Sequence, residues 1–349
     1  MIPSLNGLRA IAISLVLLSH IYIVESVPGW LKKIIWPLAN GETGVRLFFV
    51  ISGFLITWLL IKEKEKNGQI NLRLFYIRRF LRIFPVFYFY VLFVFISSKL
   101  AGFTIQGGVY VSALSYTQNF ALWGSNWLLA HSWSLSVEEQ FYLLWPGLFR
   151  GLKIHWSWKP LVLLLVIGAV ARVIAYKYPS ISPYLLLPFL QHADFLFGGC
   201  MLAYFLFYHQ AHAVRILKKI QGWHLVVGAI IILVIGKFEM DVKLDRLFLP
   251  ITGTIMVVYF MTVIAWTTRS DNNKAIGFRF LNHPWLNRIG ILSYSLYVWQ
   301  EFFLVPVYNP VSRYWWTRFP QNILLIAVAA VLSYNFIEKP FLKIKNRFR

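Results

Sequence analysis

Two residues of the first apolar run, Arg9 and His20, have the types and the spacing of a catalytic pair. They are eleven positions apart, which is roughly 1100° of helix rotation, so both side chains fall on one helix face about 16 Å apart along the axis. Imidazole suits general-base catalysis near neutral pH, and a guanidinium can hold an anion. A structural alternative stays open, in which the arginine snorkels to a membrane surface and the histidine bonds to a neighbouring helix.

A cluster of three arginines, Arg78, Arg79 and Arg82, occupies the segment FYIRRFLRIFP directly before another apolar run. On a helix, Arg82 shares a face with Arg79 three positions before it and with Arg78 four positions before it. The forked guanidinium group matches phosphate oxygens in bidentate fashion, so the cluster predicts a phosphate-binding site. The alternative is anchoring of the chain to anionic lipid.

Four glutamates, Glu138, Glu139, Glu301 and Glu338, lie within apolar runs or at their ends. Ionisable groups inside a membrane are costly, and they tend to face a cavity, a partner or a substrate route. Ser136 precedes Glu139 by three positions, which fits a capping box at a helix start and gives Glu139 a structural explanation. Glu138 is then the candidate functional carboxylate, placed to orient a histidine or to bind a sugar hydroxyl.

The remaining buried charges have structural interpretations, with one exception. Glu338 lies near the end of the last apolar run, where the helix dipole disfavours a carboxylate, so we expect it to pair with Lys339 or with the arginine cluster. Arg172 and Asp194 fall at similar depth and are expected to form an ion pair. Glu301 is the exception, because it falls near the middle of its run and remains a candidate site residue.

The elements that must position these residues are membrane-spanning helices. Of the 349 residues, 58% are hydrophobic and 13% are charged, about half of the roughly 25% typical of soluble domains. We therefore predict an all-α, polytopic integral membrane protein with about ten transmembrane helices. The expected spans are residues 7–26, 44–61, 84–100, 136–150, 159–176, 190–208, 223–237, 246–267, 289–307 and 321–339.

The net charge of +21 is explained by where the Lys and Arg residues lie relative to the predicted spans. If the N-terminus is cytoplasmic, the inner segments hold 22 Lys and Arg residues and the outer segments hold 10. This excess places both termini in the cytoplasm by the positive-inside rule, and it argues against a nucleic-acid partner. The chain has a single cysteine, Cys200, which excludes an internal disulfide. We predict no metal site at His209 and His212, because this pair has no further ligands nearby.

Taken in order, these segments resemble the acyltransferase-3 family of membrane acyltransferases. The matching segments are NGLRAIAISLVLLSH, GVRLFFVISGFLI, FYIRRFLRIFP, TQNF, HSWSLSVEEQFYLLWP, ILSYSLYVWQ and FIEKPFL. The resemblance implies transfer of an acyl group, usually acetyl, from cytoplasmic acetyl-CoA or another acyl-CoA to a hydroxyl group. The implied acceptor is a cell-envelope polysaccharide or a lipid-linked sugar, and the expected location is the bacterial cytoplasmic membrane, with membrane lipids as partners.

The resemblance also assigns roles to residues. It places Arg9 and His20 in the family's first-helix pair and Arg79 and Arg82 in its Arg-x-x-Arg motif. Glu138 and Glu139 fall in its Ser-x-Glu-Glu motif, and Glu338 matches the acidic residue of its closing motif. One position departs from the family: many members have histidine where this chain has Gln300, which strengthens the case for His20 as the base.

The domain organisation expected from the sequence is one transmembrane domain over residues 1–349, with no appended soluble domain. Two other classes of protein stay open at this stage. A polysaccharide or lipid-linked glycan exporter or flippase would also use buried charges, although no internal repeat indicates one. A membrane sensor or scaffold would leave the register of Arg9 and His20 unexplained. The acceptor and the oligomeric state are not specified by the sequence.

Overall fold

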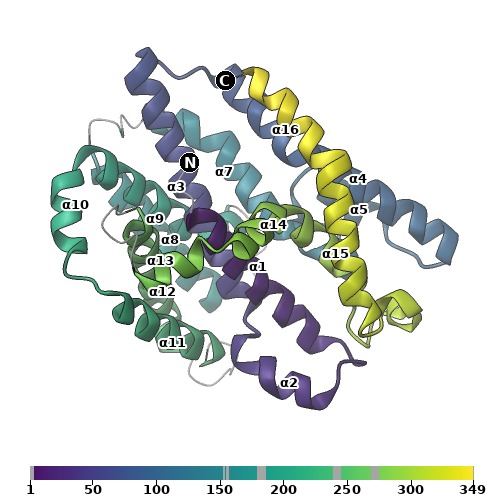
Figure 1. Cartoon of the computed structure of the whole chain (residues 1–349). Helices are drawn as coiled ribbons and strands as arrows, with labels where there is room; N and C mark the ends of the chain where they lie inside the picture. Colours follow the sequence, from purple (N-terminus) through teal and green to yellow (C-terminus); the bar gives the residue numbers. More distant parts are fainter. Residues whose placement is uncertain are drawn as a thin grey trace. The chain divides into compact units, whose positions relative to one another are not determined.

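The computed structural model describes residues 4–151, 154, 157–178, 186–238, 245–268 and 275–348. These residues are mainly helical (Figure 1), and the only extended pairing among them is an isolated bridge between Leu122 and Gly124. The all-α class predicted from the sequence is therefore confirmed. The principal helices are α1 (Ser4–Ile23), α3 (Gly41–Asn67), α4 (Leu72–Ala101), α7 (Ser132–Gly151), α8 (Lys159–Lys177), α9 (Leu187–Tyr208), α11 (Gly222–Phe238), α12 (Asp245–Thr267), α14 (Pro284–Phe303) and α15 (Gln321–Ser333).

Each of the ten predicted spans overlaps one of these helices, but the number of membrane crossings is not thereby fixed. Within the described ranges, six helical stretches are long and apolar enough to cross a membrane. A seventh crossing is possible if α10 (Gln210–Leu217) and α11, which bend by 83° at their junction, are one broken span. The protein is thus an integral membrane protein, and ten crossings remain a prediction.

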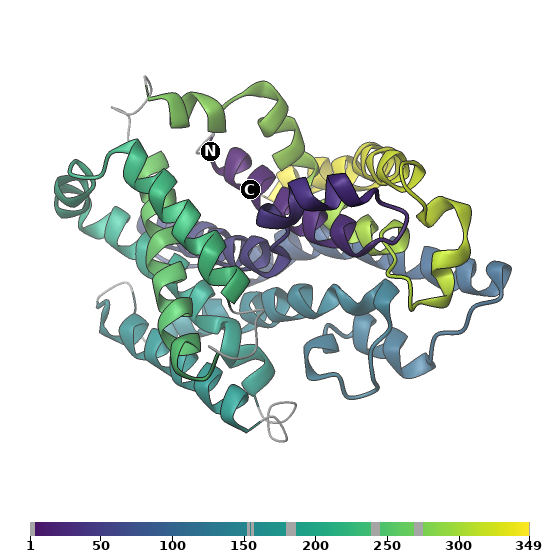
Figure 2. The ribbon, with the colours of Figure 1, turned by 90° about the horizontal axis from the view of Figure 1, so that it is seen from below.

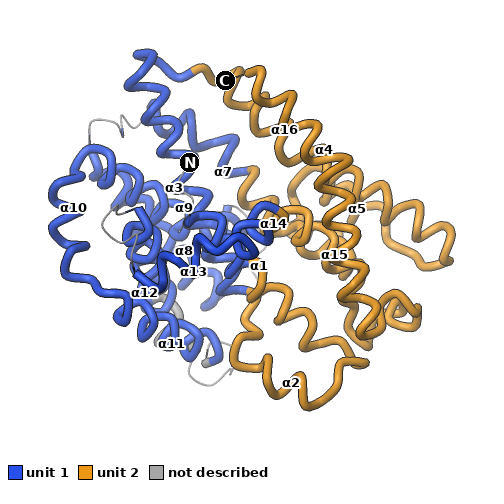
Figure 3. Tube along the Cα trace, in the orientation of Figure 1, with its two compact units in different colours: residues 1–12, 42–70, 140–291 blue, residues 13–41, 71–139, 292–349 orange. Residues whose placement is uncertain are grey.

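The chain divides into two compact units (Figure 3). Unit 1 consists of residues 1–12, 42–70 and 140–291, and unit 2 of residues 13–41, 71–139 and 292–349. The helices α1, α7 and α14 each contribute residues to both units. All the predicted site residues except Arg9 belong to unit 2.

Unit 1 is built around the packing of α8 and α12 against α9. In both views α11 lies beside α12 (Figures 1 and 2). Helix α9 also approaches α3 closely at two glycines, because a Cβ on Gly199 would clash with the backbone of Val50, and one on Gly53 with the backbone of Leu196. Glycine is therefore needed at both positions for the helices to pack at this distance.

Buried charges in unit 1 are paired. Arg172 and Asp194 form an ion pair in which both side chains are buried, as predicted. Arg46, near the start of the predicted span 44–61, is also buried, and its guanidinium donates to Glu42 one helical turn earlier. Paired charges avoid most of the cost of burying an isolated ion. These residues therefore have a structural explanation.

Unit 2 contains the pair α4 and α16 (Lys339–Lys345), which lie side by side (Figure 1). Helix α4 begins at Leu72, where the Asn71 side chain accepts a hydrogen bond from the Leu74 N–H at 3.0 Å. A π-helical turn, Tyr334–Glu338, joins α15 to α16. Shorter elements of this unit include α2 (Gly29–Ile35), α5 (Gly107–Leu114), α6 (Trp127–Ala130) and the 3₁₀ turn η7 (Asn346–Phe348).

The predicted capping box at Ser136 and Glu139 is wrong. Helix α7 begins at Ser132, one turn earlier, and the Ser136 hydroxyl donates to the Ser132 carbonyl at 2.8 Å. Ser134 likewise donates to the His131 carbonyl at 3.2 Å. In a helix interior, serine commonly bonds back to a carbonyl three or four residues earlier, and this competes with capping. Glu139 therefore loses the structural explanation that the capping box supplied.

Candidate active site

The centre of the candidate site is the His20 side chain on α1, which meets two side chains of α14 in unit 2. Its Nδ1 lies 3.0 Å from Gln300 Oε1, and its Nε2 lies 3.9 Å from Glu301 Oε1. With the Gln300 amide oxygen facing Nδ1, the imidazole carries its proton on Nδ1 and has a lone pair on Nε2, because an amide oxygen only accepts hydrogen bonds. The His20 side chain keeps 20% of its surface exposed, while Gln300 and Glu301 are buried. The His20 ring is therefore more accessible than the two α14 side chains that contact it.

His131 holds Glu301 from the other side. Its Nδ1 lies 2.7 Å from Glu301 Oε2, and its backbone N–H donates to the same oxygen at 2.9 Å. The carboxylate therefore bridges two histidines, with one oxygen fixed by His131 and the other directed to His20. His131 was not predicted as a site residue, because a single histidine outside the predicted spans gives no signal in the sequence. Its backbone position next to Glu301 arises only through the fold.

Aromatic side chains enclose this cluster. The Trp127 ring meets the His20 ring edge-on at 5.4 Å, and its indole N–H donates to the Leu304 carbonyl at 2.9 Å. Tyr297 donates to the His131 carbonyl at 3.1 Å, and Tyr90 meets the His131 ring at 5.4 Å. These contacts fix the turn between α6 and α7 and hence the position of His131.

A second group of predicted residues gathers where α4, α7 and α14 meet in unit 2. Glu139 lies within electrostatic reach of Arg79 and of its neighbour Glu138. Tyr294, which the sequence did not single out, is buried within reach of Glu139, Glu338 and Arg82. The residues predicted from two motifs far apart in sequence are therefore neighbours in the same unit.

Glu338 and Arg78 form hydrogen bonds with residues that were not predicted to belong to the site. The buried Glu338 carboxylate accepts a hydrogen bond from the Ser295 hydroxyl at 2.8 Å. Arg78 donates from Nη1 to the backbone carbonyl of Phe348 at 3.0 Å, so it ties α4 to η7. Its predicted part in phosphate binding thus competes with a structural contact.

Arg9 lies on α1 together with His20, as the spacing predicted. This end of α1 belongs to unit 1, where Asn6 donates to the side chain of Asn287 at 2.7 Å. A Cβ on Gly290 would clash with the backbone at Asn6, which indicates a close contact between α1 and the start of α14. The N-terminal turns of α1 are thus held firmly within unit 1.

The segment between α4 and α7 contains several aromatic side chains that pack against α4. Tyr116 packs against Phe84 and Phe87 with ring centroids 5.0 and 5.3 Å away. Burial raises the pKa of Tyr116 well above its ordinary value, so its hydroxyl stays neutral. Trp127 is the member of this segment that reaches the candidate site.

The candidate site thus combines a histidine that faces a carboxylate with arginines on another helix of the same unit. The sequence profile of the acyltransferase-3 family, described as an acyltransferase domain, matches residues 2–337. The chain belongs to this family.

Two relatives extend the comparison. The chain is 32% identical to the peptidoglycan O-acetyltransferase OatA of Listeria monocytogenes serovar 1/2a, over 98% of this chain and 56% of the relative. It is 30% identical to the O-acetyltransferase OatA of Staphylococcus aureus strain NCTC 8325, over 98% of this chain and 57% of the relative. The chain thus spans just over half the length of these relatives. No solved structure matches it significantly.

Proposed function

We propose that this protein is a membrane O-acetyltransferase that moves an acetyl group from acetyl-CoA to a hydroxyl group of a cell-envelope glycan. The observation that carries the proposal is the position of the His20 imidazole, with Nδ1 on Gln300 and Nε2 3.9 Å from Glu301. The names of the relatives, which include peptidoglycan O-acetyltransferase, support acetyl as the group and peptidoglycan as the acceptor class.

In the proposed reaction, the acceptor hydroxyl binds at His20 Nε2 and gives up its proton to that nitrogen. The hydroxyl oxygen attacks the thioester carbonyl, the new C–O bond forms, and the C–S bond breaks as CoA leaves and takes a proton. The imidazolium that forms is stabilised by the negative charge of Glu301, while Gln300 keeps the ring in place. A variant of the same scheme lets Nε2 carry the acetyl group transiently.

The donor is assigned to the arginines of α4. We propose that Arg79 and Arg82 hold the phosphates of acetyl-CoA, with Arg78 and Arg9 as further candidates. Glu139 would then lie beside the donor, because it is within electrostatic reach of Arg79, and Glu138 is its neighbour on α7. This assignment needs the Leu72 end of α4 on the cytoplasmic side, as the distribution of Lys and Arg predicts. The location proposed is the bacterial cytoplasmic membrane.

The direct test is transfer of label from labelled acetyl-CoA to envelope glycan in membranes that contain the full chain. His20→Ala is compared with His209→Ala, which removes an exposed histidine that follows α9. We expect label in glycan for the wild type and for His209→Ala, and none for His20→Ala. Full activity of His20→Ala defeats both versions of the mechanism. No turnover in the folded wild type with several acceptors favours an exporter or flippase, which a flux assay would detect.

A further inference from the structure

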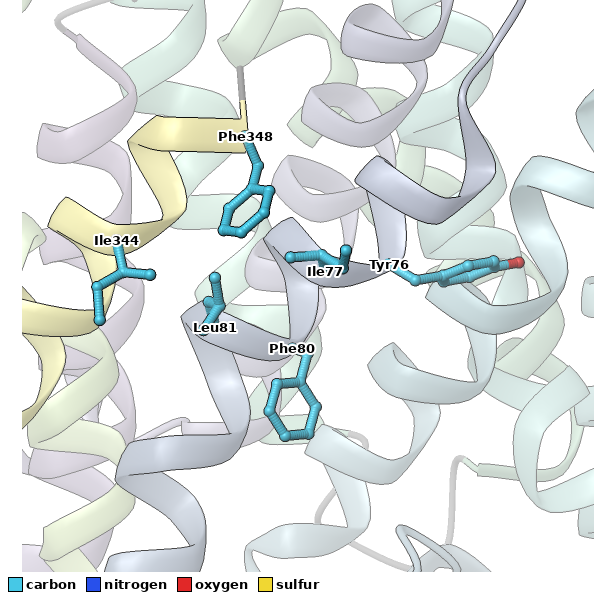
Figure 4. A pocket seen from close by; sticks show the side chains of 6 residues that line it. All are labelled: Tyr76, Ile77, Phe80, Leu81, Ile344 and Phe348. Atoms are coloured by element: carbon cyan, nitrogen blue, oxygen red, sulfur yellow. The ribbon is translucent and has the colours of Figure 1, made fainter.

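A groove separate from the His20 cluster lies on the outer surface of unit 2. It has a volume of about 360 Å³ and is lined by apolar side chains of α4 and of the C-terminal turns. In Figure 4, Ile77 and Leu81 of α4 face Ile344 of α16 and Phe348 of η7 across the groove, with Phe80 below. Tyr76 also lines the groove and carries its one polar side-chain group, so the lining is almost entirely apolar and suits an alkyl chain.

The groove faces away from the proposed donor site. Arg79 follows Ile77 by two positions, and Arg82 follows Phe80 by two, so each arginine projects about 200° around the helix from a groove residue. Phe80 is 51% exposed and Ile344 is 40% exposed. The groove therefore opens outward from the helix pair, on helices that are long and apolar enough to span a membrane.

An aromatic row continues the groove along α4. The rings of Phe80 and Phe84 lie 4.6 Å apart, and those of Phe84 and Tyr88 lie 5.2 Å apart. This i, i+4 row runs toward the middle of the helix, where Tyr116 packs against Phe84 and Tyr88.

The end of the groove is strongly cationic. Segments 71–83 and 339–348, which supply its lining, contain eight Lys and Arg residues and no Asp or Glu. Arg73 lies four positions before Ile77, on the same helix face, and Arg347 directly precedes Phe348. Both arginines are exposed. Exposed cations close in sequence to the lining residues of an apolar groove complement a ligand with an anionic head and an alkyl tail.

We propose that this groove binds an anionic phospholipid, with one acyl chain against Phe80 and Ile344 and the phosphate group against Arg73 and Arg347. Basic pockets between transmembrane helices recognise anionic lipid headgroups in this way. Arg78, which bonds the Phe348 carbonyl, holds η7 against α4 and so maintains the groove. The site is independent of acetyl transfer.

The test uses the full chain in phosphatidylcholine nanodiscs that contain a trace of photoactivatable lipid. The probe carries a diazirine on its acyl chain and has either a phosphatidylglycerol or a phosphatidylcholine headgroup. We expect the phosphatidylglycerol probe to label segments 71–83 and 339–348 more strongly than the phosphatidylcholine probe, by about fivefold for each arginine that contacts the phosphate. The readout is labelled peptide and does not depend on turnover.

Two double variants make the test specific. Arg73→Gln with Arg347→Gln is expected to abolish the headgroup preference, while Lys32→Gln with Lys33→Gln, which removes the same charge from α2, should leave it unchanged. Equal labelling by the two probes would show that only bulk lipid fills the groove. A preference that survives Arg73→Gln with Arg347→Gln, or labelling displaced by acetyl-CoA, would also overturn the proposal.

Discussion

Two neighbours of different chemistry act on the His20 imidazole. Gln300 is neutral and accepts a hydrogen bond from Nδ1, which fixes the tautomer, whereas Glu301 brings a negative charge near Nε2. His131 holds the carboxylate through both its ring and its backbone N–H. The arrangement separates two tasks, since one side chain orients the base and the other stabilises its protonated form.

Gln300→Leu tests the orienting role. Leucine has a similar volume but cannot accept the hydrogen bond from Nδ1–H, and an unsatisfied polar group costs about 1–3 kcal/mol. We expect kcat to fall by roughly 5- to 150-fold with little change in the KM for acetyl-CoA. Gln300→His, which restores an acceptor nitrogen, should recover much of the activity. Unchanged kcat in Gln300→Leu would show that the hydrogen bond to Gln300 is not needed.

Arg79→Gln tests the donor site. The substitution removes a charge that can pair with phosphate while keeping a side chain of moderate length. We expect the KM for acetyl-CoA to rise by about tenfold or more, as typical for loss of a charge-assisted hydrogen bond. Saturating acetyl-CoA should restore part of the rate. Lost activity at unchanged affinity for acetyl-CoA would contradict the assignment of Arg79 to the phosphates.

At the scale of elements, glycines set how closely α3 and α9 pack. Gly199→Ala places a methyl group against the backbone of α3, and overpacking of this kind costs about 1–3 kcal/mol. Gly147→Ala is the matched control, because a Cβ there meets no atom within 4 Å. We expect a lower Tm for Gly199→Ala and an unchanged or higher Tm for Gly147→Ala. Equal Tm values in the two variants would argue against the close contact.

The elements also show what the sequence can and cannot predict. Ten apolar runs predicted helices correctly because the length of an apolar run can be read directly from the local sequence. Arg172 and Asp194 were predicted to pair because charged residues within apolar runs are few and need partners. The start of α7 was misplaced because serine forms similar local patterns as a cap and inside a helix. The contact of His131 with Glu301 joins residues 170 positions apart, and no local pattern predicts such a contact.

At the scale of the whole molecule, the distribution of charge predicts the orientation in the membrane. Cys200 is the only cysteine and is buried, so the native chain offers no reactive thiol on its surface. Lys64→Cys lies in a predicted inner segment and Trp315→Cys in a predicted outer one. In intact cells, a membrane-impermeant maleimide should label Trp315→Cys and not Lys64→Cys. The opposite pattern would reverse the topology and with it the proposed access of acetyl-CoA to Arg79.

The central claim is that His20 and Glu301 act together in acetyl transfer. The most direct measurement is a double-mutant cycle on the labelled-acetyl assay, with the wild type, His20→Ala, Glu301→Gln and the double variant. We predict that Glu301→Gln lowers kcat by about 10²-fold or more and that the double variant is no slower than His20→Ala, because the two residues act as a unit. Wild-type kcat in Glu301→Gln, or losses that add fully in the double variant, would contradict the account.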